Sequence, residues 1–228
     1  MDLPVYGSME EMRKELVDCR LCKRLVEFRE SVPVRRAFEG EEYWRRPVPG
    51  FGDVEARLMI LGLAPSAQGG NRTGRIFTGD ESARFLFRAL HGAGLANRGV
   101  SERRGDGLEL KGCYLTAAVK CVPPENRPTG EETVCCRRYL WNEMRLLKRV
   151  EAVLVLGQFA LGAYLGYVKG EGGRVAGVAF RHGACYEVEG FARVYMSYHP
   201  SPQNTNTGKL TEAMFDEVLQ RIKRDLKL

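Results

Sequence analysis

The amino-acid sequence predicts an α/β protein, a three-layer α/β/α sandwich around a mostly parallel sheet. Three continuous apolar runs, at 57–64, 113–119 and 152–157, lack polar alternation, which is typical of strands buried on both faces of a sheet. A fourth strand is predicted at 193–198, and segments with helical spacing separate the four. Strands that alternate with helices favour a parallel sheet covered by helices on both sides. At 228 residues the chain fits a single domain, 1–228, with a sizeable core.

The composition is that of a soluble globular protein, with 44% hydrophobic and 28% charged residues. No apolar run is long enough to cross a bilayer, and the N-terminal stretch has neither a basic region nor an apolar signal core. We therefore expect a cytoplasmic protein with no membrane partner. A net charge of +6 favours a polyanionic partner, but only weakly, since many basic proteins bind no nucleic acid.

The N-terminal segment is predicted to be a short helix followed by irregular chain. Ser8 and Glu11 have the spacing of a capping box, so a helix is expected to begin there and to run to about Cys19. The segment 27–51 is charged and aromatic without a clear period, and we expect it to be extended along the domain surface.

The first core strand leads into a loop rich in glycine and small polar residues, which ends at Asp80. Glycine lets the backbone approach a ligand closely, and open α/β sheets bind ligands at the carboxyl ends of their strands. The loop is long for an ordinary connection, which favours a functional role. A helix follows it, with apolar residues at helical spacing up to Gly94.

The remaining elements follow the same alternation. The second strand stops at the double proline Pro123 and Pro124, which forbids regular structure. Thr129 and Glu132 form a second capping box and open the next helix. A short helix is expected at 158–165, an edge or hairpin strand at 184–189, and a C-terminal amphipathic helix at 210–226.

The chain contains seven cysteines, and without an export signal they are first interpreted as thiols or metal ligands. Four can converge on one centre: Cys19, Cys22, Cys121 and Cys136. Four thiolates suit either zinc or an iron-sulfur cluster, and their spacing does not separate the two. Cys135 is the rival fourth ligand, and Cys113 and Cys185 are expected to point into the core.

Three motifs together resemble one family. They are GLAPSAQGGNRTGRIFTGD at 62–80, KCVPPENRPT at 120–129 with its downstream cysteine, and HPSPQNTNTGKLT at 199–211. They closely resemble family five of the uracil-DNA glycosylases, the iron-sulfur-containing type B branch of thermophilic archaea and bacteria. The resemblance implies a central four-stranded parallel sheet, a [4Fe-4S] cluster and hydrolysis of the N-glycosidic bond of a damaged base. It also implies a prokaryotic, nucleoid-associated DNA repair enzyme.

The resemblance also implies roles for individual residues. The cluster ligands would be Cys19, Cys22, Cys121 and Cys136. Phe77 would stack on the extruded base. His199 would donate a hydrogen bond to its O2, because negative charge develops there as the bond breaks, and the backbone of Gly62, Leu63 and Ala64 would help from the other side. Gln203 would enter the gap left by the flipped nucleotide.

Two polar groups found in related branches are missing here. The turn Leu63-Ala64-Pro65 has no side chain to orient the attacking water, and Asp80 is the candidate for that role, although it equally suits a helix N-cap. The strand before Cys121 lacks the asparagine that reads the base, so Asn126 is the first candidate and Asn71 the alternative. A pocket with fewer fixed polar groups rejects fewer bases, so we expect activity on hypoxanthine or substituted uracils besides uracil.

Basic residues in and beside the motifs are expected to contact DNA phosphates, with surface charge as the alternative: Arg72, Arg75, Lys209, Arg127 and Lys120.

No lysine occupies the position of a Schiff-base nucleophile, which predicts a monofunctional glycosylase that leaves an abasic site. The expected partners are double-stranded DNA with a damaged base and the free nucleobase as product. We also expect a monomer, with a sliding clamp as a possible partner. The alternative function is a non-catalytic metal-cluster module that recognises damaged duplex.

Overall fold

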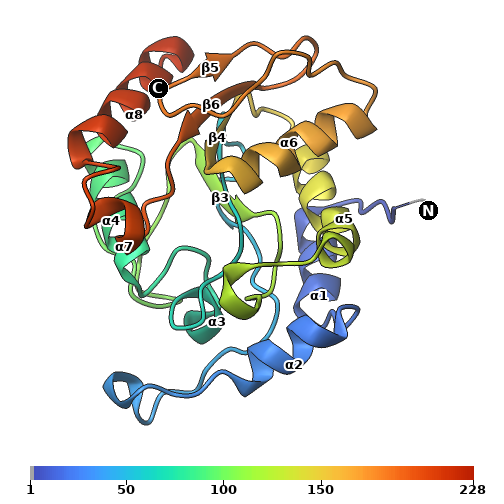
Figure 1. Ribbon diagram of the computed structural model, residues 1–228, viewed down its shortest axis with the longest axis vertical. Coiled ribbons are helices and arrows are strands. Elements are labelled where there is room, and N and C mark those ends of the chain that lie inside the picture. Colours follow the sequence, from blue (N-terminus) through green and yellow to red (C-terminus); the bar gives the residue numbers. More distant parts are fainter. Residues whose placement is uncertain (1–2) are drawn as a thin grey trace.

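The computed structural model describes residues 3–228, which form a sheet between two layers of helices (Figure 1). The sheet has six strands in the order β1-β3-β2-β4-β6-β5. Their bounds are β1 Phe51–Gly52, β2 Leu58–Gly62, β3 Cys113–Ala117, β4 Ala152–Leu156, β5 Cys185–Tyr186 and β6 Arg193–Ser197.

The four longer strands, β3, β2, β4 and β6, are neighbours and run parallel. The two-residue strands β1 and β5 pair antiparallel at the two edges. The sheet therefore has six strands instead of the four predicted for its centre, and β1 was not predicted, because two residues are too few to produce a periodic signal. The predicted hairpin partner at 184–189 is confirmed as β5.

Helices cover both faces of the sheet (Figure 1). α4 and α8 pack together on one face, while α6 packs on β4 and β2 on the other. α1 joins the second layer by packing on α5. The α-helical bounds are α1 Met9–Val17, α2 Lys23–Ser31, α3 Gly70–Thr73, α4 Glu81–Gly92, α5 Gly130–Leu146, α6 Gln158–Gly170, α7 Pro202–Thr205 and α8 Glu212–Leu226, with 3₁₀ turns η1 Arg36–Phe38 and η2 Pro124–Asn126.

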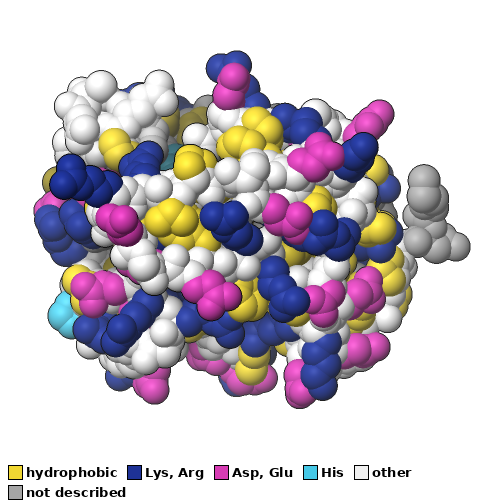
Figure 2. Space-filling view, turned by 90° about the horizontal axis from the view of Figure 1, so that it is seen from below, with side chains coloured by type: hydrophobic (Ala, Val, Ile, Leu, Met, Phe, Trp, Pro, Cys, Tyr) yellow, Lys and Arg dark blue, Asp and Glu magenta, His cyan; other side chains and the backbone are white. Residues whose placement is uncertain are grey.

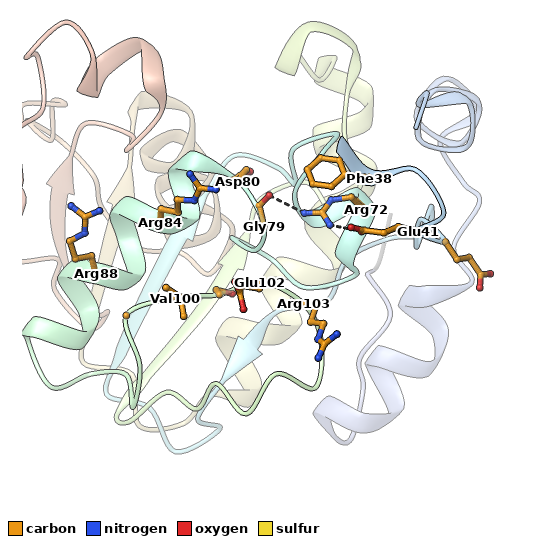
Figure 3. A pocket seen from close by; sticks show the side chains of 13 residues that line it. Phe38, Glu41, Arg72, Gly79, Asp80, Arg84, Arg88, Val100, Glu102 and Arg103 are labelled. Carbon is orange, nitrogen blue, oxygen red and sulfur yellow. Dashed lines mark hydrogen bonds and ion pairs between the residues drawn. The ribbon is translucent and has the colours of Figure 1, made fainter. Parts of the chain in front are cut away.

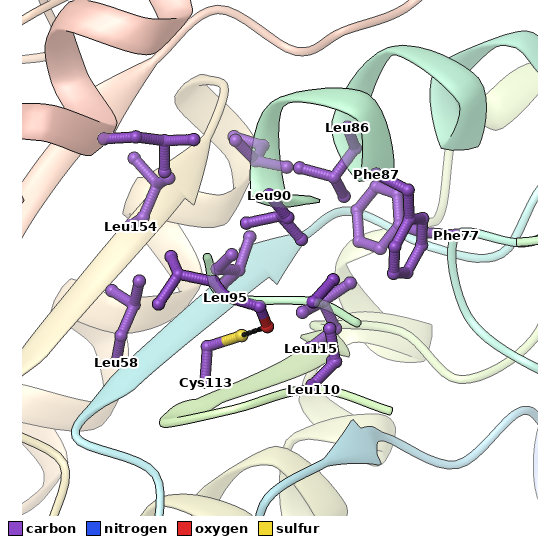
Figure 4. Close-up of a cluster of buried hydrophobic side chains, with 14 of the residues drawn as sticks. Leu58, Phe77, Leu86, Phe87, Leu90, Leu95, Leu110, Cys113, Leu115 and Leu154 are labelled. Atoms are coloured by element: carbon purple, nitrogen blue, oxygen red, sulfur yellow. Dashed lines mark hydrogen bonds between the residues drawn. The ribbon is translucent and has the colours of Figure 1, made fainter. Parts of the chain in front are cut away.

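The core between the sheet and α4 consists of aliphatic and aromatic side chains (Figure 4). Leu58 and Leu115 of the strands face Leu86 and Leu90 of α4, and all four are fully buried. The Cys113 thiol lies in this core and donates to the Leu95 carbonyl at 3.5 Å. The expectation that Cys113 is a core residue is thus confirmed, whereas Cys185 is only half-buried.

The predicted helix starts are confirmed by their side-chain caps. Asp80 accepts from the Ala83 N–H and Thr129 accepts from the Glu132 N–H, with Glu132 returning the bond. Ser8 accepts from the Glu11 N–H, although the Glu11 carboxylate reaches the Gly7 N–H instead of that of Ser8.

Two helices differ from the prediction. α2 occupies part of the segment expected to be extended, and α6 runs five residues beyond the predicted end at Leu165, to Gly170. Neither helix spans a membrane, and no other helix within residues 3–228 is long and apolar enough to do so.

The face seen from the side of α2 carries Lys and Arg side chains interspersed with Asp and Glu (Figure 2). Charges of both signs alternate over it instead of forming a single basic patch. The charge on this face therefore does not mark a DNA-contacting region, which must be identified from geometry.

Candidate active site at the carboxyl edge of the sheet

Two loops leave the sheet at the same edge, because β2 and β6 are parallel strands. We call residues 63–80, after β2, the glycine loop, and residues 198–211, after β6, the HPSP loop. The two loops contact each other through aromatic rings: Phe77 and His199 stack with centroids 6.1 Å apart and planes 29° from parallel. The structure thus brings together the two side chains expected to contact a flipped base.

Phe77 is held in an unusual backbone conformation. Its φ is +49°, in the left-handed region that side chains with a Cβ rarely adopt, and such strain concentrates at functional sites. Its ring lies against Gly62, where an added Cβ would sit 2.6 Å from the ring. Glycine at 62 is therefore required for the ring to approach the end of β2. The side chain is 8% exposed.

His199 follows directly after the last buried stretch of β6 and is half-buried. Burial lowers the pKa of His199 below its ordinary value, and the nearby charge of Asp80 acts in the opposite direction. The imidazole is thus neutral at pH 7, with one N–H to donate. The side-chain amide of Asn204 donates to the His199 carbonyl at 2.8 Å and fixes the backbone behind it.

Asp80 has the helix-capping role that the sequence left open, and its carboxylate keeps acceptor sites that could serve the other role. One carboxylate oxygen accepts from the Ala83 N–H at 2.9 Å and caps α4, and the other accepts from the Ser66 hydroxyl. A carboxylate offers about four lone-pair sites, so two remain for a water molecule. Ser66, the first polar side chain after the turn, was not predicted to take part in the site.

The backbone of the turn offers further donors. The carbonyls of Gly62 and Leu63 accept from Ala118 and Val119 at 3.0 and 2.9 Å. No hydrogen bond within residues 3–228 uses the N–H of Leu63 or Ala64. Two N–H groups are therefore available at the end of β2, on the side where backbone donors were predicted.

A cavity of about 870 Å³ opens beside Asp80 (Figure 3). Arg84 and Arg88, one turn apart on α4, line it together with Gly79 and the segment 99–103. Both arginines are largely exposed. Phe77 and His199 do not line this cavity, whereas Asp80 lines it and also lies close enough to His199 for its charge to act on the imidazole.

The two candidate asparagines differ in exposure. Asn126 is exposed, has a φ of +57°, and its side chain makes no hydrogen bond within residues 3–228. Asn71 is 1% exposed and its Nδ2 donates to the Arg29 carbonyl at 3.1 Å, while its Oδ1 has no partner among the described residues. Only Asn126 has a whole amide available to a ligand.

The structure does not place Arg72 and Arg75 for phosphate contact, which corrects the expectation for both. Arg72 is 8% exposed, pairs with Glu41 at 2.5 Å and lies 3.8 Å from the centre of the Phe38 ring (Figure 3). Arg75 pairs with Asp106 at 2.6 Å, both side chains being almost fully buried. Buried guanidinium groups with partners hold the glycine loop in place.

The two residues of the HPSP loop that are expected to contact DNA, Gln203 and Lys209, are by contrast exposed. Gln203 lies in α7 and Lys209 in the turn after it, with the Lys209 amine 4.8 Å from the centre of the Tyr198 ring. Arg127 is also exposed, whereas Lys120 is buried and pairs with Glu143 at 2.6 Å. Lys120 is therefore a structural residue.

The cysteines converge at the other side of the glycine loop. One small cavity is lined by Cys19, Cys22, Cys121, Cys135 and Cys136 together with Arg29. Burial raises the pKa of the Cys121 and Cys136 thiols. Within residues 3–228, no three His, Cys, Asp or Glu side chains have the arrangement that would hold a single metal ion.

Hydrogen-bond donors point at two of these sulfurs. The Arg29 guanidinium lies 3.1 Å from the Cys121 sulfur, and the Lys120 N–H lies 3.2 Å from the Cys136 sulfur. Arg29 is 2% exposed, and its Nε has no partner among the described residues. Its nearest carboxylate is the partly exposed Glu30 at 3.8 Å. A buried cation of this kind fits an anionic, thiolate-bound group. No sequence signal marked Arg29.

The fold and the site together describe an α/β protein with a neutral histidine and a carboxylate beside an aromatic ring at the carboxyl edge of a parallel sheet. Comparison with known sequences gives the family. Residues 49–223 match the family described as the Uracil DNA glycosylase superfamily. The chain belongs to this superfamily.

Similar proteins from bacteria and archaea match nearly end to end. The chain is 52% identical to the type-5 uracil-DNA glycosylase of Thermus thermophilus, over 94% of this chain and 97% of that protein. It is 48% identical to the type-5 uracil-DNA glycosylase of Pyrobaculum aerophilum, over 96% of this chain and 94% of that one. The type-5 enzyme of Mycobacterium leprae is 44% identical, over 96% of both chains.

Proposed function

We propose that this protein excises uracil from DNA by flipping the nucleotide into the pocket between the glycine loop and the HPSP loop and hydrolysing its N-glycosidic bond. The product is an abasic site and a free base. The observation that carries the proposal is the stacking of Phe77 with His199, beside Asp80, at the ends of two parallel strands. Family membership supports the same reaction class.

Each residue contributes at a defined point of the reaction. Phe77 provides a flat apolar surface on which the flipped base stacks. As the bond to the sugar lengthens, negative charge develops on the base, and the neutral imidazole of His199 donates to its O2. The free N–H groups of Leu63 and Ala64 face the same developing charge. Asp80 orients a water with its remaining lone pairs toward the sugar carbon.

An abasic-site assay tests the proposal. Purified protein is incubated with a duplex that contains one U·G pair, and alkali then opens any abasic site. Strand cleavage that depends on uracil is expected. A protein that binds this duplex but yields no alkali-labile site would instead be a damage-recognition module, the alternative function predicted from the sequence.

The base is read by Asn126 in this proposal, and Asn71 is the alternative. Asn126→Ala should lower the excision rate by about 10- to 100-fold, the cost of losing a hydrogen-bonded contact to a buried polar edge. Gln220→Ala, at an exposed side-chain amide of α8, is the control. If Asn71→Ala slows excision while Asn126→Ala does not, the roles are reversed.

A wider substrate range is also part of the proposal. The turn Leu63-Ala64-Pro65 and the strand before Cys121 lack the polar side chains expected there from related branches, so bases other than uracil should be rejected less strongly. Excision rates are compared on U·G and hypoxanthine·T duplexes of the same sequence. Cleavage of both is expected, and strict preference for uracil would contradict this part of the proposal.

The enzyme is proposed to be monofunctional. Lys120 is 1% exposed and its amine is bound to Glu143 and Thr116 at 2.6 Å, so it is unavailable as a nucleophile. Borohydride added during the reaction should therefore trap no protein-DNA adduct. An adduct that disappears in Lys209→Arg would identify the exposed lysine as a nucleophile. The monomeric state and a sliding-clamp partner stay predictions.

We further propose that Cys19, Cys22, Cys121 and Cys136 hold a [4Fe-4S] cluster. The donor set supports this: five thiols line one cavity, and the buried guanidinium of Arg29 lies 3.1 Å from the Cys121 sulfur. Bound there, the cluster would join the N-terminal segment to the chain that follows β3.

Iron content and the visible absorption of the purified protein test the cluster directly. Cys22→Ser should lose both, while Cys185→Ser, a cysteine outside the cavity, should keep both. Cys135→Ser and Cys136→Ser decide the fourth ligand. Stoichiometric zinc in place of iron would contradict the proposal.

A further inference from the structure

A second histidine lies directly behind the site. His182 ends the glycine-rich segment that follows α6, outside all three motifs. Its ring stacks on that of Tyr198, with centroids 5.1 Å apart and planes 11° from parallel. Its Nδ1 accepts a hydrogen bond from the Tyr198 N–H at 3.2 Å. Since Tyr198 immediately precedes His199, this bond holds the backbone from which His199 extends.

The backbone of His199 is thus anchored on both sides by side chains. Before it, the Tyr198 N–H binds His182, and the Tyr198 carbonyl accepts from the Ser197 hydroxyl at 2.9 Å. After it, the His199 carbonyl accepts from Asn204. The Asn204 anchor lies within the HPSP loop itself, whereas His182 belongs to a separate segment and supplies the long-range contact.

We propose that His182 is a positioning residue for base excision, whose imidazole fixes the end of β6 so that His199 faces the O2 of the flipped base. The inference rests on the role proposed for His199. A donor that stabilises developing charge must be preorganised, and a displacement of about 1 Å can cost up to about 100-fold in rate.

The surroundings of His182 favour a neutral imidazole, which can accept a hydrogen bond at Nδ1. Burial lowers the pKa of His182, while a hydrogen bond with the backbone of Met214 and the charge of Glu217, both in α8, act the other way. The lowered pKa keeps the ring neutral at pH 7, and a neutral imidazole protonated on Nε2 leaves Nδ1 free to accept.

Two substitutions separate the hydrogen bond from the ring stack. His182→Phe keeps an aromatic ring against Tyr198 but removes the acceptor, whereas His182→Asn loses the ring but places an amide oxygen near the position of Nδ1. We expect single-turnover excision on a U·G duplex to fall about 10-fold in His182→Phe and to recover to within about 3-fold of wild type in His182→Asn. Affinity for abasic DNA should be unchanged in both. His91→Phe, at an exposed histidine of α4, is the matched control.

A double-mutant cycle with His199→Ala gives the decisive readout. If His182 acts through His199, His182→Phe causes no further loss in the His199→Ala background. A wild-type rate in His182→Phe, or an equal loss in both backgrounds, would overturn the inference. Thermal unfolding is followed in parallel, and His182→Leu serves as the acceptor-free variant if the phenylalanine prevents folding. Lack of uracil excision by the wild-type protein would instead contradict the proposed function.

Discussion

The glycine loop and the HPSP loop meet at one pocket but are held by different kinds of contact. Arg72 and Arg75 tie the glycine loop to Glu41 and Asp106, each 31 residues away in the sequence, through buried guanidinium groups. Side-chain bonds within the HPSP loop are local, as in the contact of Thr207 with the Gln203 carbonyl at 2.7 Å. One side of the pocket is thus part of the core, and the other presents exposed side chains.

This difference indicates a division of roles. A fixed loop suits groups whose position determines the rate, and Phe77 and Asp80 lie in it. An exposed segment suits groups that must enter or follow the DNA, and Gln203 and Lys209 lie there. Substitutions in the glycine loop should therefore affect chemistry or folding. Those at the exposed residues within 203–209 of the HPSP loop should affect DNA binding, whereas His199, at the start of that loop, belongs with the chemistry.

The largest effect is expected at Asp80. Asp80→Asn keeps the shape and retains an oxygen that can cap α4, but removes the charge that orients water. The single-turnover excision rate should fall by about 10² to 10⁴, the usual contribution of a general base. Affinity for uncleaved DNA should be unchanged. Glu81→Gln, the exposed neighbour in the first turn of α4, is the control and should retain the wild-type rate.

Loss of the buried ion pair that holds the glycine loop should lower the stability of the fold. Arg75→Met leaves Asp106 buried without its partner, which should cost about 3–5 kcal/mol of unfolding free energy. Denaturant unfolding measures this change. Arg84→Met, at an exposed arginine, should change stability by less than about 0.5 kcal/mol. Equal unfolding free energies of Arg75→Met and Arg84→Met would contradict the claim that the buried ion pair holds the glycine loop.

The HPSP loop is probed through Gln203. Gln203→Ala should weaken binding to a uracil-containing duplex by about 10-fold, because no side chain then fills the gap left by the flipped base. The melting temperature should be unchanged, since Gln203 is exposed. Fluorescence anisotropy with labelled duplex measures the affinity. Gln220→Ala, at an exposed glutamine of α8, should bind as wild type.

The smallest effect concerns pH. The lowered pKa of His199 means that the unfolded chain binds a proton more readily, so stability is full above about pH 6.5 and falls as the pH drops below it. Burial raises the pKa of Asp106, but hydrogen bonds from Arg75 and from backbone N–H groups outweigh burial and hold this pKa below its ordinary range. The contribution of Asp106 to stability is therefore full above about pH 4 and does not change between pH 7 and 5. Between pH 7 and 5 the melting temperature should drop by about 2–4 °C, and by less in His199→Gln.

Local signals predicted much of this molecule. The four core strands were recognisable because their residues are continuously apolar, and three helix starts because Ser8, Asp80 and Thr129 are side-chain caps. α2 was not predicted, because it lacks both a side-chain cap and a regular apolar period. Cys22 provides no capping bond, and a charged residue, Arg29, occupies one of its buried positions, which hides the apolar period.

The roles of charged residues depended on distant partners. Nothing near Arg75 in the sequence indicates that Asp106 lies beside it, so burial of the pair could not be predicted from local pattern. The same holds for Ser66 beside Asp80 and for His182 beside Tyr198. The family motifs supplied the residues that are proposed to face the ligand, while the groups that hold them in position became visible only in three dimensions.

A structure of the protein with free uracil bound tests the central claim most directly. The account predicts that the base stacks on Phe77, with its O2 within hydrogen-bond distance of a ring nitrogen of His199 and with Asp80 beside the atom that carried the sugar. A base bound in the cavity along Arg84 and Arg88, away from the Phe77 and His199 rings, would contradict it.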